Sequence, residues 1–358
     1  MLKRTRTRSF AAGLMLAALA LGACSSDAGS DTTIVAETTA ADTGAVDTAS
    51  PSESVPASEA ATADTVPAPA AAGAGIKLAV NPWTGSAVNA NVAKVVLESM
   101  GTPVELVDID ENATWAGLDA GDLDAVLEVW PSGHAKDFDT YITGKKSVVE
   151  LGKLGPQARI GWYVPQFVLD ENPSLATWEG FKDAALAKKF ATAESGDLGQ
   201  FLMGDPSYVS YDEQIIKNLD LPLKYVVAGS EAALITAIQQ AEADKKPLLL
   251  QFWQPHWLQS KVKLARVALP DPTDACAASA AAKDGKYACD YPVDVLYKAA
   301  SARLEAKNAM AFAFLQKFQM TTDQQNEIAA LVDSDKMKAD AAAKQWVAAN
   351  PDAVKAWM

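Results

Sequence analysis

The sequence predicts an α/β fold made of two lobes that are joined by a two-segment hinge. Three observations predict it. Strand and helix patterns alternate in two separate stretches, extended segments bracket the second stretch, and residues 76–358 are enough for two domains of ~100 to 200 residues each. We expect lobe 1 at residues 76–166 and 262–358, and lobe 2 at residues 167–261.

The first alternating stretch consists of three apolar runs separated by two helical segments. A short apolar run ends at residues 81–83, after which Ser86 can cap a helix that Gly101 terminates. Gly121 ends a second, shorter helix. Such alternation with short links is typical of a parallel sheet covered on both faces. The expected elements are strands at 76–80, 104–107 and 125–129, and helices at 86–100 and 113–120.

The second stretch repeats this alternation and predicts the other lobe. Extended segments at 160–168 and 264–269 lie on either side of it and are expected to cross between the lobes as the hinge. Beyond residue 291 the chain is rich in alanine, and helices expected at 293–306 and 308–319 would pack back on lobe 1. The expected elements of the second stretch are strands at 190–193, 225–227 and 247–252, and helices at 211–218 and 231–241.

The first residues predict export from the cytoplasm. Four basic residues precede an apolar run at 10–21 that is too short to span a bilayer, which indicates a signal peptide over residues 1–23. Small residues then lead directly to Cys24, in a pattern that resembles the lipobox of bacterial lipoproteins. We therefore expect a mature chain that begins at Cys24 and is lipid-anchored on the extracytoplasmic face of the membrane.

The segment at 24–75 is predicted to be a disordered tether. After Cys24 it contains no Lys, Arg or aromatic residue, so it cannot bury enough apolar surface to offset its ordering entropy. The whole chain has a net charge of −14, and removal of the four basic leader residues lowers it to −18. So acidic a protein is a poor partner for nucleic acid, and we expect it to meet the membrane only through its anchor.

The two remaining cysteines are predicted to form a disulfide. In an oxidising compartment, Cys276 and Cys289 favour a disulfide over a metal site, because no histidine or third cysteine lies near them in sequence. The two histidines, His134 and His256, do not have the spacing of metal ligands either. We expect neither a metal nor a cofactor.

Three tryptophans occupy equivalent places in the two predicted lobes. Trp83, Trp130 and Trp253 each follow a predicted strand, and ligands of open α/β sheets bind at the carboxyl ends of strands. A single tryptophan at a strand end is more often a packing residue. Three of them, contributed by both lobes, indicate a shared aromatic cage.

An aromatic cage predicts a particular kind of ligand. Indole faces attract a cation without offering it a hydrogen bond, and a quaternary ammonium group has no N–H to donate. A primary amine would instead require carboxylates that accept its protons. The sequence therefore favours a quaternary ammonium ligand.

Four short strings resemble the glycine betaine and proline betaine binding proteins of ABC importers. They span nearly the whole predicted folded part and occur in a consistent order. The resemblance implies a two-lobed periplasmic-binding-protein fold of the venus-flytrap type II class, a quaternary ammonium ligand, and an ABC permease with its ATPase as partners. The strings are Val-Asn-Pro-Trp-Thr at 80–84, Gly-Asp-Leu-Asp at 121–124 with Trp-Pro at 130–131, Gly-Trp-Tyr-Val-Pro at 161–165, and Trp-Gln-Pro-His-Trp at 253–257.

The resemblance also implies site residues. Trp83, Trp130 and Trp253 match the three rings that surround the trimethylammonium head. His134 matches a histidine that binds the ligand carboxylate, together with amides of the turn 195–200, including Gly199 and Gln200. We expect this turn to follow a strand and open a helix, so that its N–H groups face an anion.

Other functions remain open. Asp197 would place a negative charge beside the predicted carboxylate site, which keeps choline, carnitine and other small cations as alternatives to glycine betaine. An exported hydrolase is a remote alternative, because the chain has no Gly-x-Ser-x-Gly motif and both later cysteines are expected to be paired. We therefore expect a binding protein that is not an enzyme.

Overall fold

The computed structural model describes residues 73–358. The predicted signal peptide, Cys24 and nearly all of the predicted tether lie outside the described residues. Within residues 73–358, none of the helices is both long enough and apolar enough to span a membrane.

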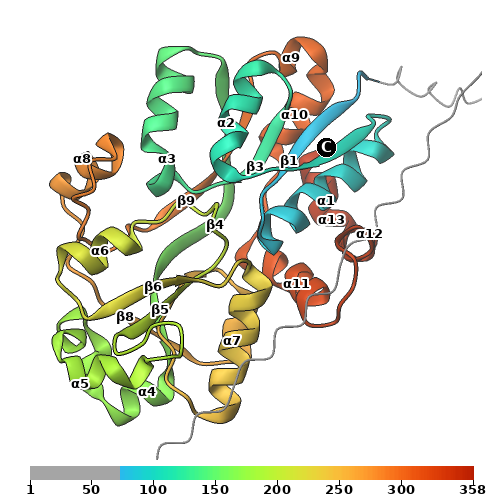
Figure 1. Ribbon diagram of the computed structural model, residues 1–358. Helices are drawn as coiled ribbons and strands as arrows, with labels where there is room; N and C mark the ends of the chain where they lie inside the picture. Colours follow the sequence, from blue (N-terminus) through green and yellow to red (C-terminus); the bar gives the residue numbers. More distant parts are fainter. Residues whose placement is uncertain (1–72) are drawn as a thin grey trace, which may run out of the picture. The chain divides into compact units, whose positions relative to one another are not determined.

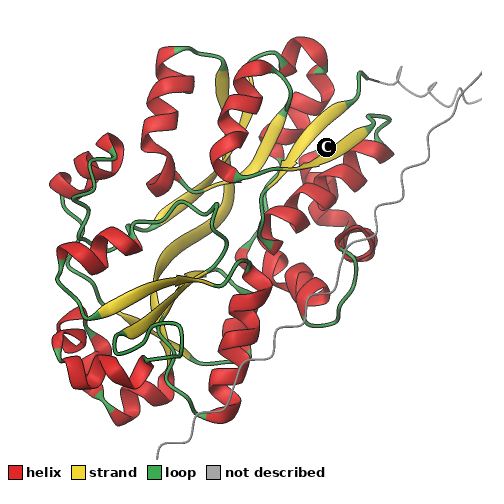
Figure 2. Ribbon diagram, viewed as in Figure 1, coloured by secondary structure: helices red, strands yellow, loops and turns green. Residues whose placement is uncertain are grey.

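The sheet of lobe 1 is built around three parallel strands (Figures 1 and 2). β1 pairs in parallel with β2 and β3, and the antiparallel β9 joins β3 to the long strand β4. The strands are β1 (Ile76–Val80), β2 (Val104–Asp108), β3 (Ala125–Val129), β4 (Val148–Pro165) and β9 (Asp294–Ser301). The first helices are α1 (Thr84–Ser99), α2 (Glu111–Ala120) and α3 (Pro131–Asp137), followed by a π-helical turn at Phe138–Gly144.

The C-terminal helices complete lobe 1. Phe314 and Trp346, which lie on two of these helices, belong to the same buried cluster as Val92 and Val96 of α1. The C-terminal helices therefore pack on the same face of the sheet as α1. The helix expected at 308–319 is present as α10. The helices are α9 (Leu304–Lys307), α10 (Ala309–Lys317), α11 (Thr322–Asp333), α12 (Ala339–Ala349) and α13 (Pro351–Trp357).

The sheet of lobe 2 has the order β4-β7-β5-β6, with β8 on the other edge of β4. β5 is parallel to β6 and β7, as the alternating pattern indicates. The strands are β5 (Gly199–Met203), β6 (Leu223–Val227), β7 (Leu250–Gln254) and β8 (Leu264–Val267). The helices are α4 (Gln166–Glu171), α5 (Ala184–Ala187), α6 (Asp212–Asn218), α7 (Glu231–Asp244) and α8 (Asp274–Ala282), with short 3-10 turns at Pro173–Ala176, Trp178–Lys182, Lys188–Phe190 and Trp257–Ser260.

The strand β4 belongs to both sheets and carries the chain from lobe 1 into lobe 2 (Figure 1). Its residues 148–158 pair with β9, and its residues 159–165 pair with β7 and β8. The predicted crossings at 160–168 and 264–269 are therefore mainly strands inside the second sheet. The lobe boundaries fall near residues 158 and 294, and lobe 2 is larger than the sequence predicts.

Two of the predicted elements are wrong. Residues 190–193 are not a strand, because a 3-10 turn ends at Phe190 and the strand β5 begins only at Gly199. Residues 293–306 are not one helix, because the strand β9 occupies 294–301. In β9, buried and half-buried side chains alternate over the first four residues, and insertion between β3 and β4 outweighs the helix propensity of its alanines.

The predicted disulfide between Cys276 and Cys289 is present and links α8 to the following loop. The two Cα atoms are 6.2 Å apart, within the usual range for such a bond. Both cysteines are buried against Tyr287 in the core of lobe 2. The bond therefore secures a peripheral segment of that lobe.

Candidate functional site

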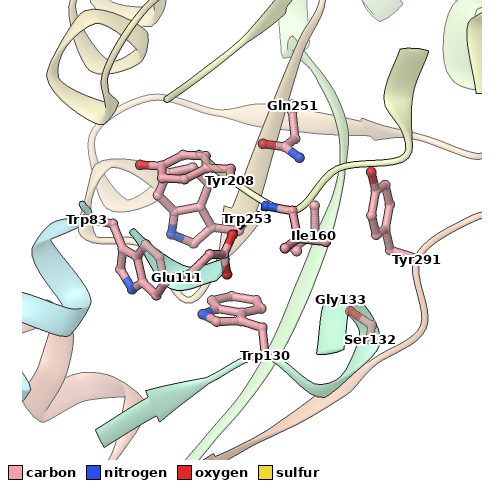
Figure 3. A pocket seen from close by; sticks show the side chains of 11 residues that line it. Trp83, Glu111, Trp130, Ser132, Gly133, Ile160, Tyr208, Gln251, Trp253 and Tyr291 are labelled. Carbon is pink, nitrogen blue, oxygen red and sulfur yellow. Dashed lines mark hydrogen bonds between the residues drawn. The ribbon is translucent and has the colours of Figure 1, made fainter. Parts of the chain in front are cut away.

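The three predicted tryptophans line one small cavity (Figure 3). Trp83 follows β1 and Trp130 follows β3 in lobe 1, whereas Trp253 lies near the end of β7 in lobe 2. Each is only 7% to 8% exposed. The cavity has a volume of about 40 Å³, a few times the roughly 10 to 15 Å³ that one water requires.

A fourth ring, Tyr208, closes the gap between the lobes. It comes from the loop between β5 and α6, and its centroid lies 5.8 Å from the centroids of both Trp83 and Trp253 in edge-on geometry. Its hydroxyl donates to the carbonyl oxygen of Pro82 at 2.9 Å, which ties lobe 2 to the end of β1. No sequence motif indicates Tyr208 as a site residue. Its place in the cage depends on its contacts with Trp83 and Pro82 of the other lobe, which the local sequence does not show.

Behind two of the rings lies a buried carboxylate, Glu128 of β3. Its Oε1 accepts the indole N–H of Trp83 at 2.8 Å and that of Trp130 at 3.1 Å. Its Oε2 accepts from Asn89 at 2.8 Å and Gln325 at 3.2 Å. Burial raises the pKa of Glu128 to about 7, although the hydrogen bonds from the two indoles oppose this shift. Because Glu128 does not line the cavity, both indole N–H groups point away from the ligand space.

The remaining wall contains one carboxylate, that of Glu111 at the start of α2. Its Oε1 accepts the backbone N–H of Val209 from lobe 2, and its Oε2 lies 3.1 Å from Nε2 of His134. The Ser132 hydroxyl, another wall group, donates to Asp294 at 2.6 Å. Among the described residues that line the cavity there is no lysine, arginine or histidine.

Comparison with known proteins decides the family. Residues 74–349 match the family described as the substrate-binding domain of ABC-type glycine betaine transport systems. The chain belongs to this family. It is therefore an extracytoplasmic substrate-binding protein of an ABC importer of that type, and it is not an enzyme.

Two relatives in this family have informative names. The trimethylamine N-oxide-binding protein of Pelagibacter ubique is 30% identical over 280 residues, which cover 77% of this chain and 88% of that protein. The glycine betaine/carnitine transport binding protein of Listeria monocytogenes is 27% identical over 129 residues, which cover 36% of this chain and 37% of that one.

Solved structures agree on the fold. The glycine betaine and L-proline binding protein of Borrelia burgdorferi aligns with a TM-score of 0.65 at 19% identity, covering 79% of this chain and 96% of that one. A lactococcal protein in its closed form with glycine betaine has a TM-score of 0.62 at 21% identity, covering 79% and 98%. A choline-binding protein with choline has a TM-score of 0.63 at 17% identity, covering 80% and 91%.

The structure does not bring His134 of this binding protein into the cavity. The ring is buried, with Nε2 3.1 Å from Glu111 and Nδ1 3.0 Å from Asp137. Burial opposes its charge, but the hydrogen bonds to Asp137 and Glu111 outweigh this effect and raise the pKa of His134 to about 9. His134 therefore holds Glu111 in place and does not face the ligand space.

The turn at 195–200 is also placed differently from the prediction. It neither follows a strand nor opens a helix, because Gly199 and Gln200 are the first residues of β5. The carboxyl end of β5, at Met203, leads towards Tyr208, so Gly199 lies at the opposite end of the strand. Its N–H donates to Pro222 at 3.0 Å, and the Gln200 Oε1 accepts from Thr192 at 2.7 Å. The structural context predicted for this turn is therefore wrong, and neither Gly199 nor Gln200 lines the cavity.

A second contact between the lobes lies beside the cage and involves Glu231 at the start of α7. Its Oε2 accepts from the backbone N–H of Thr84 at 2.7 Å and from the Thr84 hydroxyl at 2.9 Å. Asp333 of α11 lies 2.8 Å from the same hydroxyl and accepts the indole N–H of Trp257 from lobe 2 at 2.6 Å. We call this set of four residues, Thr84, Glu231, Trp257 and Asp333, the interlobe cluster.

His256 joins this cluster without offering a metal site. Oxygen and nitrogen atoms of Glu231, His256 and Asp333 lie within 4.8 Å of one another. However, Nδ1 of His256 accepts the N–H of Leu258 at 3.1 Å, so Nε2 carries the proton that it donates to Glu231 at 3.1 Å. Neither nitrogen keeps a free lone pair for a metal, and the cluster acts as a set of hydrogen bonds.

Proposed function

We propose that this protein captures a small ligand with a trimethylated nitrogen in the aromatic cavity and delivers it to an ABC permease. The observation that carries the proposal is the convergence of Trp83, Trp130, Trp253 and Tyr208, from both lobes, on one small space. Each ring contributes roughly 0.5 to 2 kcal/mol of attraction to a desolvated cation. Because the rings come from both lobes, the ligand favours the closed arrangement over an open one.

Within this ligand class, the wall of the cavity favours compounds without a carboxylate. Glu111 would repel the carboxylate of glycine betaine, and no basic side chain lines the cavity to compensate. Choline can donate its hydroxyl proton to Glu111. Trimethylamine N-oxide, the ligand in the name of the Pelagibacter relative, has no carboxylate. We therefore place choline and trimethylamine N-oxide ahead of glycine betaine and carnitine.

Titration calorimetry with choline, trimethylamine N-oxide, glycine betaine and carnitine tests the proposal. We expect binding of at least one trimethylated compound, with glycine betaine weaker than the best ligand. In the Glu111→Gln variant, the affinity for glycine betaine relative to choline should rise at least fivefold, because a repulsive charge is removed. Preference for an amino acid or a sugar over all four compounds would refute the proposed ligand class.

We further propose that the protein is anchored by lipid at Cys24. The support is the basic leader, the short apolar run and the small residues before this cysteine. Mass spectrometry of the protein from its native membrane should find a mature N-terminus at a lipid-modified Cys24. A mature chain that begins elsewhere, without lipid, would contradict the anchor but not the ligand.

A further inference from the structure

Glu128 is a buried carboxylate without a positive partner. Its four hydrogen bonds come from the neutral side chains of Trp83, Trp130, Asn89 and Gln325. It is 2% exposed, and no ion pair among residues 73–358 involves it. Its two oxygens accept four donors, which suits a carboxylate, but no positive group among residues 73–358 compensates the cost of burying its charge.

The position of Glu128 relative to the ligand space provides an explanation. It lies directly behind two of the three cage indoles, at the N–H edges of both rings. A negative charge there attracts a cation enclosed by the rings, and the hydrogen bonds polarise the indoles so that their faces become more negative. We propose that Glu128 is a counter-charge of the bound trimethylated cation and acts through Trp83 and Trp130, in addition to Glu111 of the cavity wall, which is paired with His134. This inference rests on the proposed ligand class.

None of the described groups that hydrogen-bond Glu128 or shift its pKa is positively charged. The nearby titratable groups from lobe 2 are Glu231, whose negative charge raises the pKa of Glu128, and the Tyr208 phenol. Burial raises the pKa of Tyr208, so the phenol remains neutral. From lobe 1, Asn89 on α1 and Gln325 on α11 contribute only amide groups. A bound cation would therefore supply a positive charge that no described residue hydrogen-bonded to Glu128 provides.

If Glu128 is a counter-charge, the affinity for a cationic ligand should fall as the pH is lowered. Without ligand, burial holds the pKa of Glu128 at about 7, so protonation below that pH removes the counter-charge. A cation stabilises the carboxylate and lowers its pKa in the complex, so binding releases protons near pH 7. The affinity for choline should therefore fall several-fold from pH 8 to pH 6 and level off above pH 8.

The test compares cationic ligands with neutral carbon analogues of the same shape. Choline is paired with 3,3-dimethylbutan-1-ol, and trimethylamine N-oxide with tert-butanol. The experiment uses the pair whose cation the unmodified protein binds. Glu128→Gln keeps the size of the side chain and removes its charge, and it should lower the ratio of cation affinity to analogue affinity by about fivefold. Gln325→Met is the matched control, because it removes one hydrogen bond to Glu128 and leaves the charge in place. It should change the ratio by less than twofold.

Two results would overturn the inference. One is an equal loss of affinity for the cation and its analogue in Glu128→Gln, which would mean that Glu128 only orients the rings. The other is a pH profile of cation binding that is the same in Glu128→Gln and in the unmodified protein. The comparison of pH profiles tests the role of Glu128 even if the neutral analogues bind too weakly to measure. If the unmodified protein binds none of the trimethylated compounds, the proposed function itself fails, which is a separate outcome.

Discussion

Replacing Trp130 by alanine should weaken binding of the trimethylated ligand by about a hundredfold. The variant loses one face of the cage and the attraction of that ring for a desolvated cation, and it opens the cavity to water. It also leaves Glu128 with one neutral donor fewer. Titration calorimetry measures the loss directly, and circular dichroism checks that the variant is folded.

If the rings form one cage, replacing a tryptophan of either lobe should lower the ligand affinity by a similar factor. Trp83→Ala and Trp253→Ala should each weaken binding by a comparable factor, since both rings line the same cavity. Trp178→Ala is the matched control. This half-buried indole lies 4.6 Å from the Lys182 ammonium and does not line the cavity, so its loss should leave affinity unchanged. Full affinity in Trp253→Ala would show that lobe 2 does not contribute to the cage.

Replacing Glu231 by alanine should weaken ligand binding by about thirtyfold without any contact to the ligand. Glu231 accepts two hydrogen bonds from Thr84 across the lobes, and each bond to a charged group contributes about 1.5 to 3 kcal/mol. In an open protein, water satisfies these groups. The variant therefore disfavours closure, and the ligand should dissociate faster with little change in its association rate.

Stopped-flow fluorescence separates the two rates, and a second variant of the same helix serves as the control. Glu242→Ala removes a carboxylate near the end of α7 that forms an ion pair with Lys245. It should leave both rates unchanged. If Glu231→Ala slows association and leaves dissociation untouched, the interlobe cluster does not stabilise the closed form.

Part of the site could be predicted because it depends on which residues follow each strand in the sequence. β1 and β3 have the predicted bounds. Trp130 follows β3 directly, and Trp83 follows β1 after two residues. The carboxyl ends of parallel strands meet at one edge of a sheet, so the strand pattern alone is enough to place Trp83 and Trp130 together. Trp253 could be added because lobe 2 repeats the same alternation.

The rest of the site depends on contacts between distant segments. Glu128 lies within a strand that is buried on both faces, and no local pattern shows that its carboxylate meets two indoles. Tyr208 and Val209 come from a loop of lobe 2 that reaches the cavity only through contacts with Trp83 and Glu111 of lobe 1. The ligand role of His134 rests on resemblance alone, and two nearby carboxylates, Glu111 and Asp137, bind its ring instead.

A crystal structure of the protein with choline or trimethylamine N-oxide bound is the most direct test of the aromatic cage. We predict that the trimethylated nitrogen lies within about 6 Å of the ring centroids of Trp83, Trp130 and Trp253 at once. A ligand bound elsewhere, or one whose nitrogen contacts tryptophans of a single lobe, would contradict it.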